Sequence, residues 1–259
     1  MQRCKTGKLK QYNNIKKEFN FNLELEKKRK SNNLLKVFGI GNKKIKTLEK
    51  MNIYTINNLK RAEKNKKITL TQQQLLGLKY YDKIERSIDR NTIIMITDKL
   101  RTMLNNIEIT NAGSYRALKQ YAGDIDLIAH SKTINTKIIN EIINKLINEK
   151  IIVDIFLRGT KKIICIINID NKFYQMDMLF TNTKQLPWYL LYFGSGRDFS
   201  KKIRLYASKQ GYKLNEKGLF DKITGKKIKL NVDKEEDIFK FLKIKYIKPE
   251  NRNLMVKIN

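Results

Sequence analysis

A glycine-serine pair followed at a fixed distance by two aspartates most constrains what this chain can fold into. Nine residues separate Ser114 from Asp124, and Asp126 opens an apolar run. Gly113 lets backbone amides approach a phosphate closely, and the serine adds a hydroxyl donor. Residues two apart on a strand point to one face, so both carboxylates would lie side by side and suit Mg²⁺. The pattern predicts metal-dependent nucleotidyl transfer, with a polar turn entering a half-buried strand as the alternative.

The charge of the chain predicts a polyanionic partner. The chain has 259 residues, 41% of them hydrophobic, which is enough for the core of one domain or two associated domains. Its 55 Lys and Arg against 25 Asp and Glu give a formal charge of +30. The self-repulsion of such an excess is usually tolerated for nucleic acid rather than for a membrane. A compositional bias toward Lys, Asn and Ile is the alternative explanation.

The cysteines and the single histidine exclude two classes of site. Cys4 and Cys165 are far apart and His130 stands alone, so a Cys/His zinc cluster and a disulfide framework are both excluded. No apolar run approaches the roughly 20 residues that a membrane helix needs, and no signal-peptide pattern occurs. We therefore expect a soluble intracellular protein without a membrane partner, with His130 at the surface or at a strand end.

A second motif predicts contact with a phosphate backbone. An apolar helix end meets Gly39-Ile40-Gly41, with Lys43 just beyond, and Thr55 is placed to cap a further short helix. This pattern favours a helix-hairpin-helix whose backbone N–H groups hold DNA phosphate directly or through a monovalent cation. An ordinary helix-helix turn is the alternative. The helix after the hairpin should present one apolar face, formed by Ile45, Leu48 and Met51.

The spacing of apolar residues in the rest of the chain predicts helices followed by a sheet. Apolar residues recur at helical spacing over residues 69–109, and residues 136–149 form another amphipathic helix. A C-terminal part follows, with an aromatic and glycine cluster, a basic helix and an amphipathic helix over 235–242. Between them lie three expected strands, which span residues 151–157, 162–169 and 173–180.

The third of these strands supplies a third carboxylate. Its alternation puts Asp177 on the face opposite Tyr174 and Met176. A partly buried aspartate needs a partner, and a metal shared with the first two aspartates would supply one. Asp154 and Asp170 compete for this place. We prefer Asp177, because Asp170 belongs to the turn before the strand and Asp154 lies on a strand expected to be further away.

Taken in order, these motifs resemble those of the family X DNA polymerases, the polymerase beta-like group, over residues 34–253. The resemblance rests on five segments: Gly39–Gly41, Gly113–Asp126, Tyr174–Asp177, Tyr192–Phe193 and Tyr246–Glu250.

The resemblance implies an α+β fold. It consists of a nucleotidyltransferase palm with a mixed or antiparallel sheet, preceded by a helical helix-hairpin-helix region and followed by a small α+β subdomain. The expected segments are a basic amino-terminal segment over 1–33, the DNA-binding helices over 34–92, the palm over 93–185 and a nucleotide-selecting subdomain over 186–259. Thr6–Leu9 resembles only the closing end of the family's lyase domain, so we expect no lyase activity.

The resemblance also implies roles for individual residues. Asp124 and Asp126 would bind two Mg²⁺ ions, or Mn²⁺ in their place, and Asp177 would join the metal that activates the primer 3′-hydroxyl. The nucleotide-binding residues would be Gly113, Ser114, Arg116, Gly123, Tyr192, Phe193, Gly194, Ser195, Arg197 and Ser200. The DNA-binding residues would be Gly39, Ile40, Gly41, Lys43, Arg204 and Asn215.

Several positions depart from the family pattern. Ala117 and Ser87 stand where triphosphate-binding arginines are common, and Gln175 replaces an arginine beside the third carboxylate. We expect a weaker triphosphate grip and altered selectivity rather than loss of chemistry. The side chains that would compensate are Arg116, Lys119, Arg86 or Arg90.

The expected function is a monomeric DNA-directed DNA polymerase. It would extend a primer on gapped DNA with deoxynucleoside triphosphates, as in short-gap repair. Template-independent terminal transfer uses the same metals and is one alternative. A DNA-end-binding protein with a degenerate site is the other.

Overall fold

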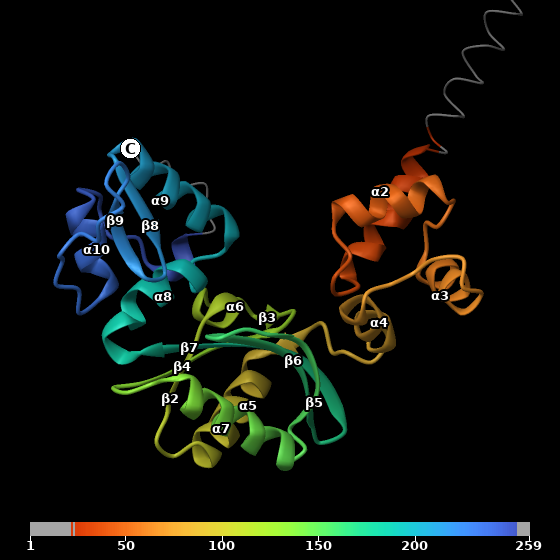
Figure 1. Cartoon of the computed structure of the whole chain (residues 1–259), viewed down its shortest axis with the longest axis horizontal. Coiled ribbons are helices and arrows are strands. Elements are labelled where there is room, and N and C mark those ends of the chain that lie inside the picture. The colour runs from red at the N-terminus through yellow and green to blue at the C-terminus, as the bar shows by residue number, and fades with distance from the viewer. Residues whose placement is uncertain (1–21, 23, 253–259) are drawn as a thin grey trace, which may run out of the picture. The chain divides into compact units, whose positions relative to one another are not determined.

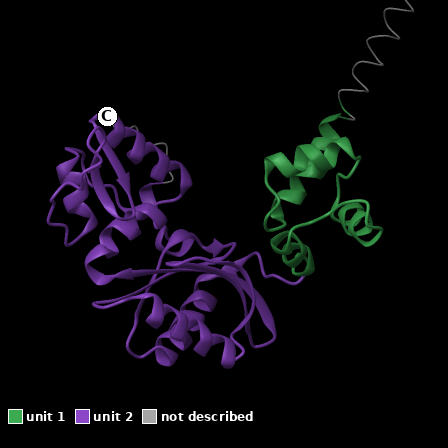
Figure 2. Ribbon diagram, in the orientation of Figure 1, with its two compact units in different colours: residues 1–82 green, residues 83–259 purple. Residues whose placement is uncertain are grey.

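The computed structural model describes residue 22 and residues 24–252. These residues form two compact units, one over residues 1–82 and one over 83–259 (Figure 2). Most of the basic amino-terminal segment, with Cys4 and Thr6–Leu9, lies outside the described residues. The four expected segments stay a prediction, and helix α5, Arg90–Met103, runs across the expected boundary at 92/93.

The first unit is helical, with a tight connection at the predicted hairpin. Gly39 has a φ of +80°, which a residue with a side chain rarely adopts, and its carbonyl accepts a 2.9 Å hydrogen bond from Gln74 Nε2. Thr55 caps the next helix as predicted, accepting from the Asn58 N–H. Met51 was wrongly assigned to the apolar face, because it ends its helix and is 43% exposed. The elements are a 3-10 helix Asn33–Lys36, α2 Asn42–Lys50, α3 Ile56–Lys64 and α4 Gln72–Lys79.

The second unit is built on a mixed five-stranded sheet with the order β2-β4-β7-β6-β5 (Figure 1). β4 and β7 are parallel, and the other neighbouring pairs are antiparallel. The expected mixed sheet is therefore confirmed. The strands are β2 Glu108–Asn111, β4 Ile125–Ser131, β5 Ile152–Arg158, β6 Lys162–Ile169 and β7 Lys172–Asn182.

The two faces of this sheet have different surroundings. Helices α5 and α7, Thr136–Asn148, cover one face, where Leu127 of β4 and Met178 of β7 join the main core (Figure 1). The alternate residues point to the other face, where Ile128 packs with Tyr189 of α8, Leu186–Phe193. Strand alternation thus leaves this second face for polar side chains.

The carboxy-terminal part of this unit has its own core. Phe199 and Phe239 are buried there and stack with ring centroids 6.2 Å apart. Its helices and strands confirm the predicted basic helix and the predicted helix near residue 235. They are α8, α9 Arg197–Lys209, β8 Tyr212–Asn215, β9 Gly218–Asp221, α10 Glu235–Phe241 and a 3-10 helix Pro249–Asn251.

The stretch over residues 69–109 is only partly helical. α4 and α5 occupy most of it, but Ile88–Asp89 forms strand β1 and Ile109 lies in β2. β1 pairs with β3, Tyr121–Ala122, and β2 pairs with β4, so partners distant in sequence override the helical spacing. Within residues 22 and 24–252, no helix has both the length and the apolar character to span a bilayer.

Candidate active site

Three aspartates meet on the sheet face that α5 and α7 leave open. In the parallel pair, Asp126 of β4 lies in register with Asp177 of β7, so the two side chains project from one face. Asp124 immediately precedes β4 and lies two residues from Asp126. All three are partly buried. Asp154 lies on edge strand β5, and Asp170 has a left-handed φ of 51° in the turn before β7. The structure thus places the preferred three side by side.

Gly113 lies directly against Asp126. A Cβ atom at position 113 would stand 1.8 Å from Asp126 Oδ2, and the φ of +49° favours glycine independently. The Gly-Ser pair was expected as a turn, but it begins a four-residue helix, α6 Gly113–Arg116. The Ala112 N–H donates to the Asp126 carbonyl over 2.9 Å, which ties this helix to β4. The absent side chain therefore makes room for the carboxylate.

Burial and mutual repulsion make Asp124 and Asp126 hard to ionise. Burial raises the pKa of Asp126 to about 8, and the charges of Asp124 and Asp177 push it in the same direction. Burial, then the charge of Asp177, also raises the pKa of Asp124. Lys162 partly offsets both shifts in pKa. The ionised cluster is therefore short of positive charge.

Asp177 is held by two donors. Lys162 Nζ lies 3.0 Å from Oδ2, and Gln175 Nε2 donates to Oδ1 over 3.1 Å. Its side chain is 16% exposed and that of Lys162 is 33% exposed. Both oxygens of this carboxylate are thus engaged by neighbouring side chains.

The cluster has the chemistry of a divalent-cation site. Its donors are hard carboxylate oxygens, which suit Mg²⁺ or Mn²⁺. The raised pKa values of Asp124 and Asp126 indicate a deficit of positive charge that such an ion would correct. Over the described residues, no three His, Cys, Asp or Glu side chains form a preformed metal site. The donor atoms therefore suit a metal ion. In this structure Asp177 instead contacts Lys162, and Asp126 packs against Gly113.

A cavity of about 460 Å³ opens beside Asp126. It brings together eight residues that the sequence nominated: Gly113, Ser114, Asp126, Tyr192, Phe193, Arg197, Ser200 and Arg204. The other three lining residues are Ala117, Lys119 and Gly196, of which Lys119 was expected to compensate for Ala117. Segments from α6, α8 and α9 thus enclose one space next to the carboxylates.

The aromatic wall of this cavity is preorganised. Tyr192 and Phe193 meet edge to face with centroids 4.8 Å apart. Arg204 donates to the Ser200 carbonyl over 2.9 Å, and its guanidinium lies 5.1 Å from the Tyr192 ring centroid. These contacts orient the ring and the guanidinium together.

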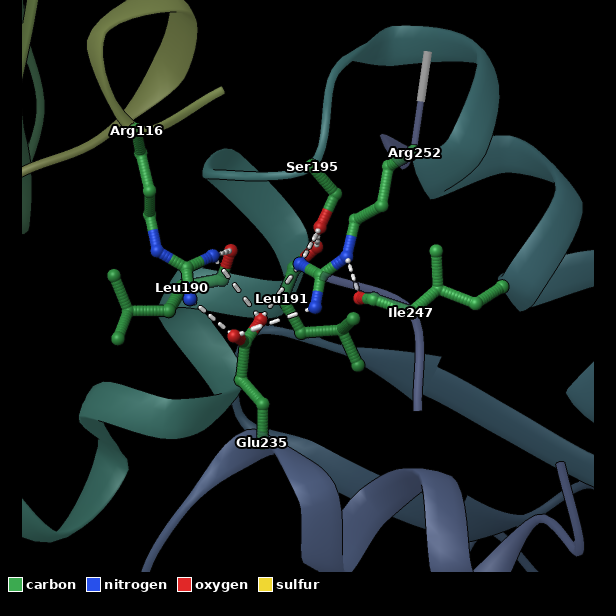
Figure 3. A network of polar contacts seen from close by, with 7 residues as sticks. All are labelled: Arg116, Leu190, Leu191, Ser195, Glu235, Ile247 and Arg252. Atoms are coloured by element: carbon green, nitrogen blue, oxygen red, sulfur yellow. Dashed lines mark hydrogen bonds and ion pairs between the residues drawn. The ribbon is translucent and has the colours of Figure 1, made fainter. Parts of the chain in front are cut away.

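Two nominated residues, Arg116 and Ser195, belong to a buried ionic network instead of the cavity lining (Figure 3). Arg116 forms an ion pair with Glu235, and Arg252 Nη1 lies 2.9 Å from Glu235 Oε1. Arg252 also donates to Ser195 Oγ over 2.8 Å. Arg252 and Glu235 are 0% and 3% exposed. The network joins α6 to α10, so the Arg116 guanidinium is committed to Glu235.

The other nominated residues lie around or apart from the cavity. Gly194 packs against Arg116, since a Cβ there would stand 2.9 Å from Nη1. Gly123 precedes Asp124, and Asn215 lies beside Arg204 in a small neighbouring pocket. The hairpin nominees belong to the first unit, where Ile40 is buried and the others are exposed: Gly39, Gly41 and Lys43.

Three residues next to the site were not predicted from the sequence, and the place of His130 was predicted in part. Glu235, Arg252 and Lys162 carry no local motif, so only their long-range partners reveal them. His130 was expected at the surface or at a strand end. It is the second-last residue of β4, which confirms the strand end, but it is only 2% exposed and lies within hydrogen-bond distance of Thr110 and Thr183. Burial lowers the pKa of His130.

Three family models of DNA polymerase domains match successive parts of the chain. The family model of the fingers domain of DNA polymerase lambda matches residues 32–85. The family models of the DNA polymerase beta palm and the DNA polymerase beta thumb match residues 83–183 and 189–253. A DNA nucleotidylexotransferase of Xenopus laevis is 25% identical over 261 residues, and a DNA polymerase lambda of Arabidopsis thaliana is 26% identical over 252. Each alignment covers 84% of this chain, and 50% and 45% of the relatives, so the chain spans about half of their length.

Raising the pH should destabilise the metal-free protein through Asp126. Its pKa of about 8 lies above the ~3.9 of an unfolded aspartate, so the folded state retains a proton that the unfolded state loses. This stability is fully present below about pH 4 and is lost as the pH rises toward 8. In unfolding with a chelator, the parent should lose on the order of 2 kcal/mol relative to Asp126→Asn between pH 5 and 8.5. Asp170→Asn, in an exposed turn, should follow the parent. Parallel profiles for the parent and Asp126→Asn would refute this assignment.

Proposed function

This chain belongs to family X of the DNA polymerases, and we propose that it is a DNA-directed DNA polymerase that adds deoxynucleotides to a primer 3′-hydroxyl. The observation that carries the proposal is the cavity in which the Gly113 segment and Asp126 face the wall of Tyr192 and Phe193. A nucleotide with its triphosphate toward Gly113 and Ser114 would have its sugar near that wall. We propose the filling of short gaps in DNA as its setting.

The family is generally metal-dependent, and the donor set fits divalent cations. Asp124 and Asp126 would hold two Mg²⁺ or Mn²⁺ ions, with Asp177 on the ion beside the primer end. When bound, such ions lower the pKa of the attacking hydroxyl and neutralise charge on the triphosphate. The protein contributes a fixed set of oxygens on two parallel strands and room for them beside Gly113.

Two cationic side chains would bind the triphosphate in place of the arginine that Ala117 replaces. Lys119 and Arg197 line the cavity, and neither side chain has an ion pair among the described residues. Arg116 is taken by Glu235, and Arg90 donates to the Tyr115 carbonyl over 2.7 Å. Arg86 does not line the cavity, so Lys119 has the best position of the substitutes weighed from the sequence, and Arg197 lines the same cavity. Free cations facing a cavity are the usual partners of polyphosphate.

DNA would bind mainly through its backbone. The charge of +30 favours any polyanion, and the hairpin exposes Gly39, Gly41 and Lys43 while Ile40 anchors it in the core. Its backbone N–H groups would hold phosphate, directly or through a monovalent cation. Arg204 and Asn215 would approach the template side, and Tyr192 with Phe193 would crowd a ribose 2′-hydroxyl. Gly123, Gly194 and Ser200 complete the proposed nucleotide site, with Arg116 and Ser195 supporting it through the Glu235 network.

Primer extension tests the proposal. The purified protein with Mg²⁺ should extend a primer on gapped DNA, while Asp124→Ala, Asp126→Ala and Asp177→Ala should each lower the rate by about a hundredfold or more. Asp170→Ala, in the turn before β7, is the matched control and should keep the parent rate. Full activity in any of the three variants would refute the metal assignment.

The same assay separates the alternatives. Relatives named DNA nucleotidylexotransferase match this chain, which favours template-independent transfer as the second candidate. Extension of a single strand as fast as of gapped DNA would replace the main proposal with that one. DNA binding with no incorporation, even with Mn²⁺, would point to a degenerate DNA-end-binding protein.

The two cavity cations should control nucleotide affinity. Lys119→Ala and Arg197→Ala should each raise the KM for deoxynucleoside triphosphate about tenfold, because each removes a charge-assisted contact with phosphate. The kcat should change less. Lys137→Ala, an exposed lysine on α7, removes the same charge at a distance and should leave the KM unchanged. An unaltered KM in both cavity variants would exclude them from the triphosphate site.

A further inference from the structure

We propose that Lys162 is a positioning residue that holds Asp177 in the orientation needed for the metal site. This inference rests on the proposed polymerase function. Lys162 comes from β6, the strand next to β7, and its ammonium lies 3.0 Å from Asp177 Oδ2. The sequence motifs do not include it.

The register of the sheet explains why this lysine reaches the site. Lys162 is paired with Leu179, and Asp177 lies two residues before Leu179 on the same face of β7. The two side chains are therefore diagonal cross-strand neighbours, close enough for a long side chain to span. The one-third exposure of Lys162 leaves its ammonium partly hydrated while its stem lies on the sheet.

The two donors of Asp177 fix its carboxylate from both sides. Gln175 engages Oδ1 and Lys162 engages Oδ2, so rotation of the carboxylate would break one contact or the other. Gln175 is neutral, which leaves Lys162 as the charged partner of Asp177. Repulsion from Asp124 and Asp126 acts to turn Asp177 away, and the ion pair opposes it.

Lys162 also touches the nucleotide side of the site. Its ammonium lies 6.0 Å from the ring centroid of Phe193 in the cavity wall. One side chain thus contacts the carboxylate proposed for the primer end and the wall proposed for the sugar. The ion pair with Asp177 is the closer of these two contacts, so loss of Lys162 should impair the chemical step more than nucleotide binding.

The neighbouring lysine supplies a matched control. Lys161 precedes β6 and is exposed, and strand alternation points it away from Asp177. Lys161→Met removes the same charge one residue away. Lys162→Arg keeps the charge and the donors.

The first experiment measures the pair without any catalysis. Unfolding in urea of the metal-free parent, Lys162→Met, Asp177→Asn and the double variant should give a coupling factor of about three in the unfolding equilibrium constant. The same cycle with Lys161→Met should give a factor near one. A factor of one for Lys162 would overturn the proposal, whether or not the protein proves to be a polymerase.

The second experiment measures incorporation on gapped DNA. Lys162→Met should lower kcat about tenfold with the nucleotide KM within about twofold of the parent, and Lys162→Arg should recover most of the rate. Lys161→Met should match the parent. An unchanged kcat in Lys162→Met, or a Lys162→Arg variant as slow as Lys162→Met, would overturn the proposal. An inactive parent with an intact coupling factor would refute the polymerase function instead.

Discussion

Like charges gathered on one face of the β4–β7 pair are the constraint on which the rest of this structure depends. Asp126 and Asp177 lie in register on parallel strands, with Asp124 beside them, and burial raises the pKa of Asp126 to about 8. An isolated group of this kind would be expelled toward water or neutralised. The fold keeps it because helices α5 and α7 anchor the opposite face of the sheet. The strands therefore cannot turn the aspartates outward without exposing their core residues.

Two structural features accommodate the three aspartates. Gly113 has no side chain, which leaves room for the Asp126 carboxylate. The same helix, α6, ends at Arg116, which forms an ion pair with Glu235 (Figure 3). Through Glu235 and Arg252 the same short helix is tied to the carboxy-terminal part of the unit. The position of the cavity wall is thus coupled to the segment that follows Gly113. Removing one member of a buried ionic network leaves an uncompensated charge, so its members depend on one another.

The sequence predicted those features whose causes are local. The alternation around Asp177 and the cap at Thr55 follow from periodicity and turn chemistry, and the structure has both. The strand expected to carry two aspartates is only half confirmed, because Asp126 lies on β4 and Asp124 lies just before it. The features it missed depend on contacts between distant segments. Nothing near Arg116 indicates Glu235, more than a hundred residues away, and nothing near Lys162 indicates a diagonal partner on β7. Ile109 was assigned to a helix for the same reason, since pairing with β4 decides its conformation.

The proposed site for two metal ions consists of Asp124 immediately before β4, Asp126 on β4 and Asp177 on β7. It is tested most directly by counting Mn²⁺ ions bound to the protein in complex with gapped DNA and an unreactive deoxynucleoside triphosphate analogue, by electron paramagnetic resonance. We expect about two ions per chain in the parent, fewer in Asp177→Asn and loss of both in Asp126→Asn. The same number of ions in the parent and in Asp126→Asn would contradict it.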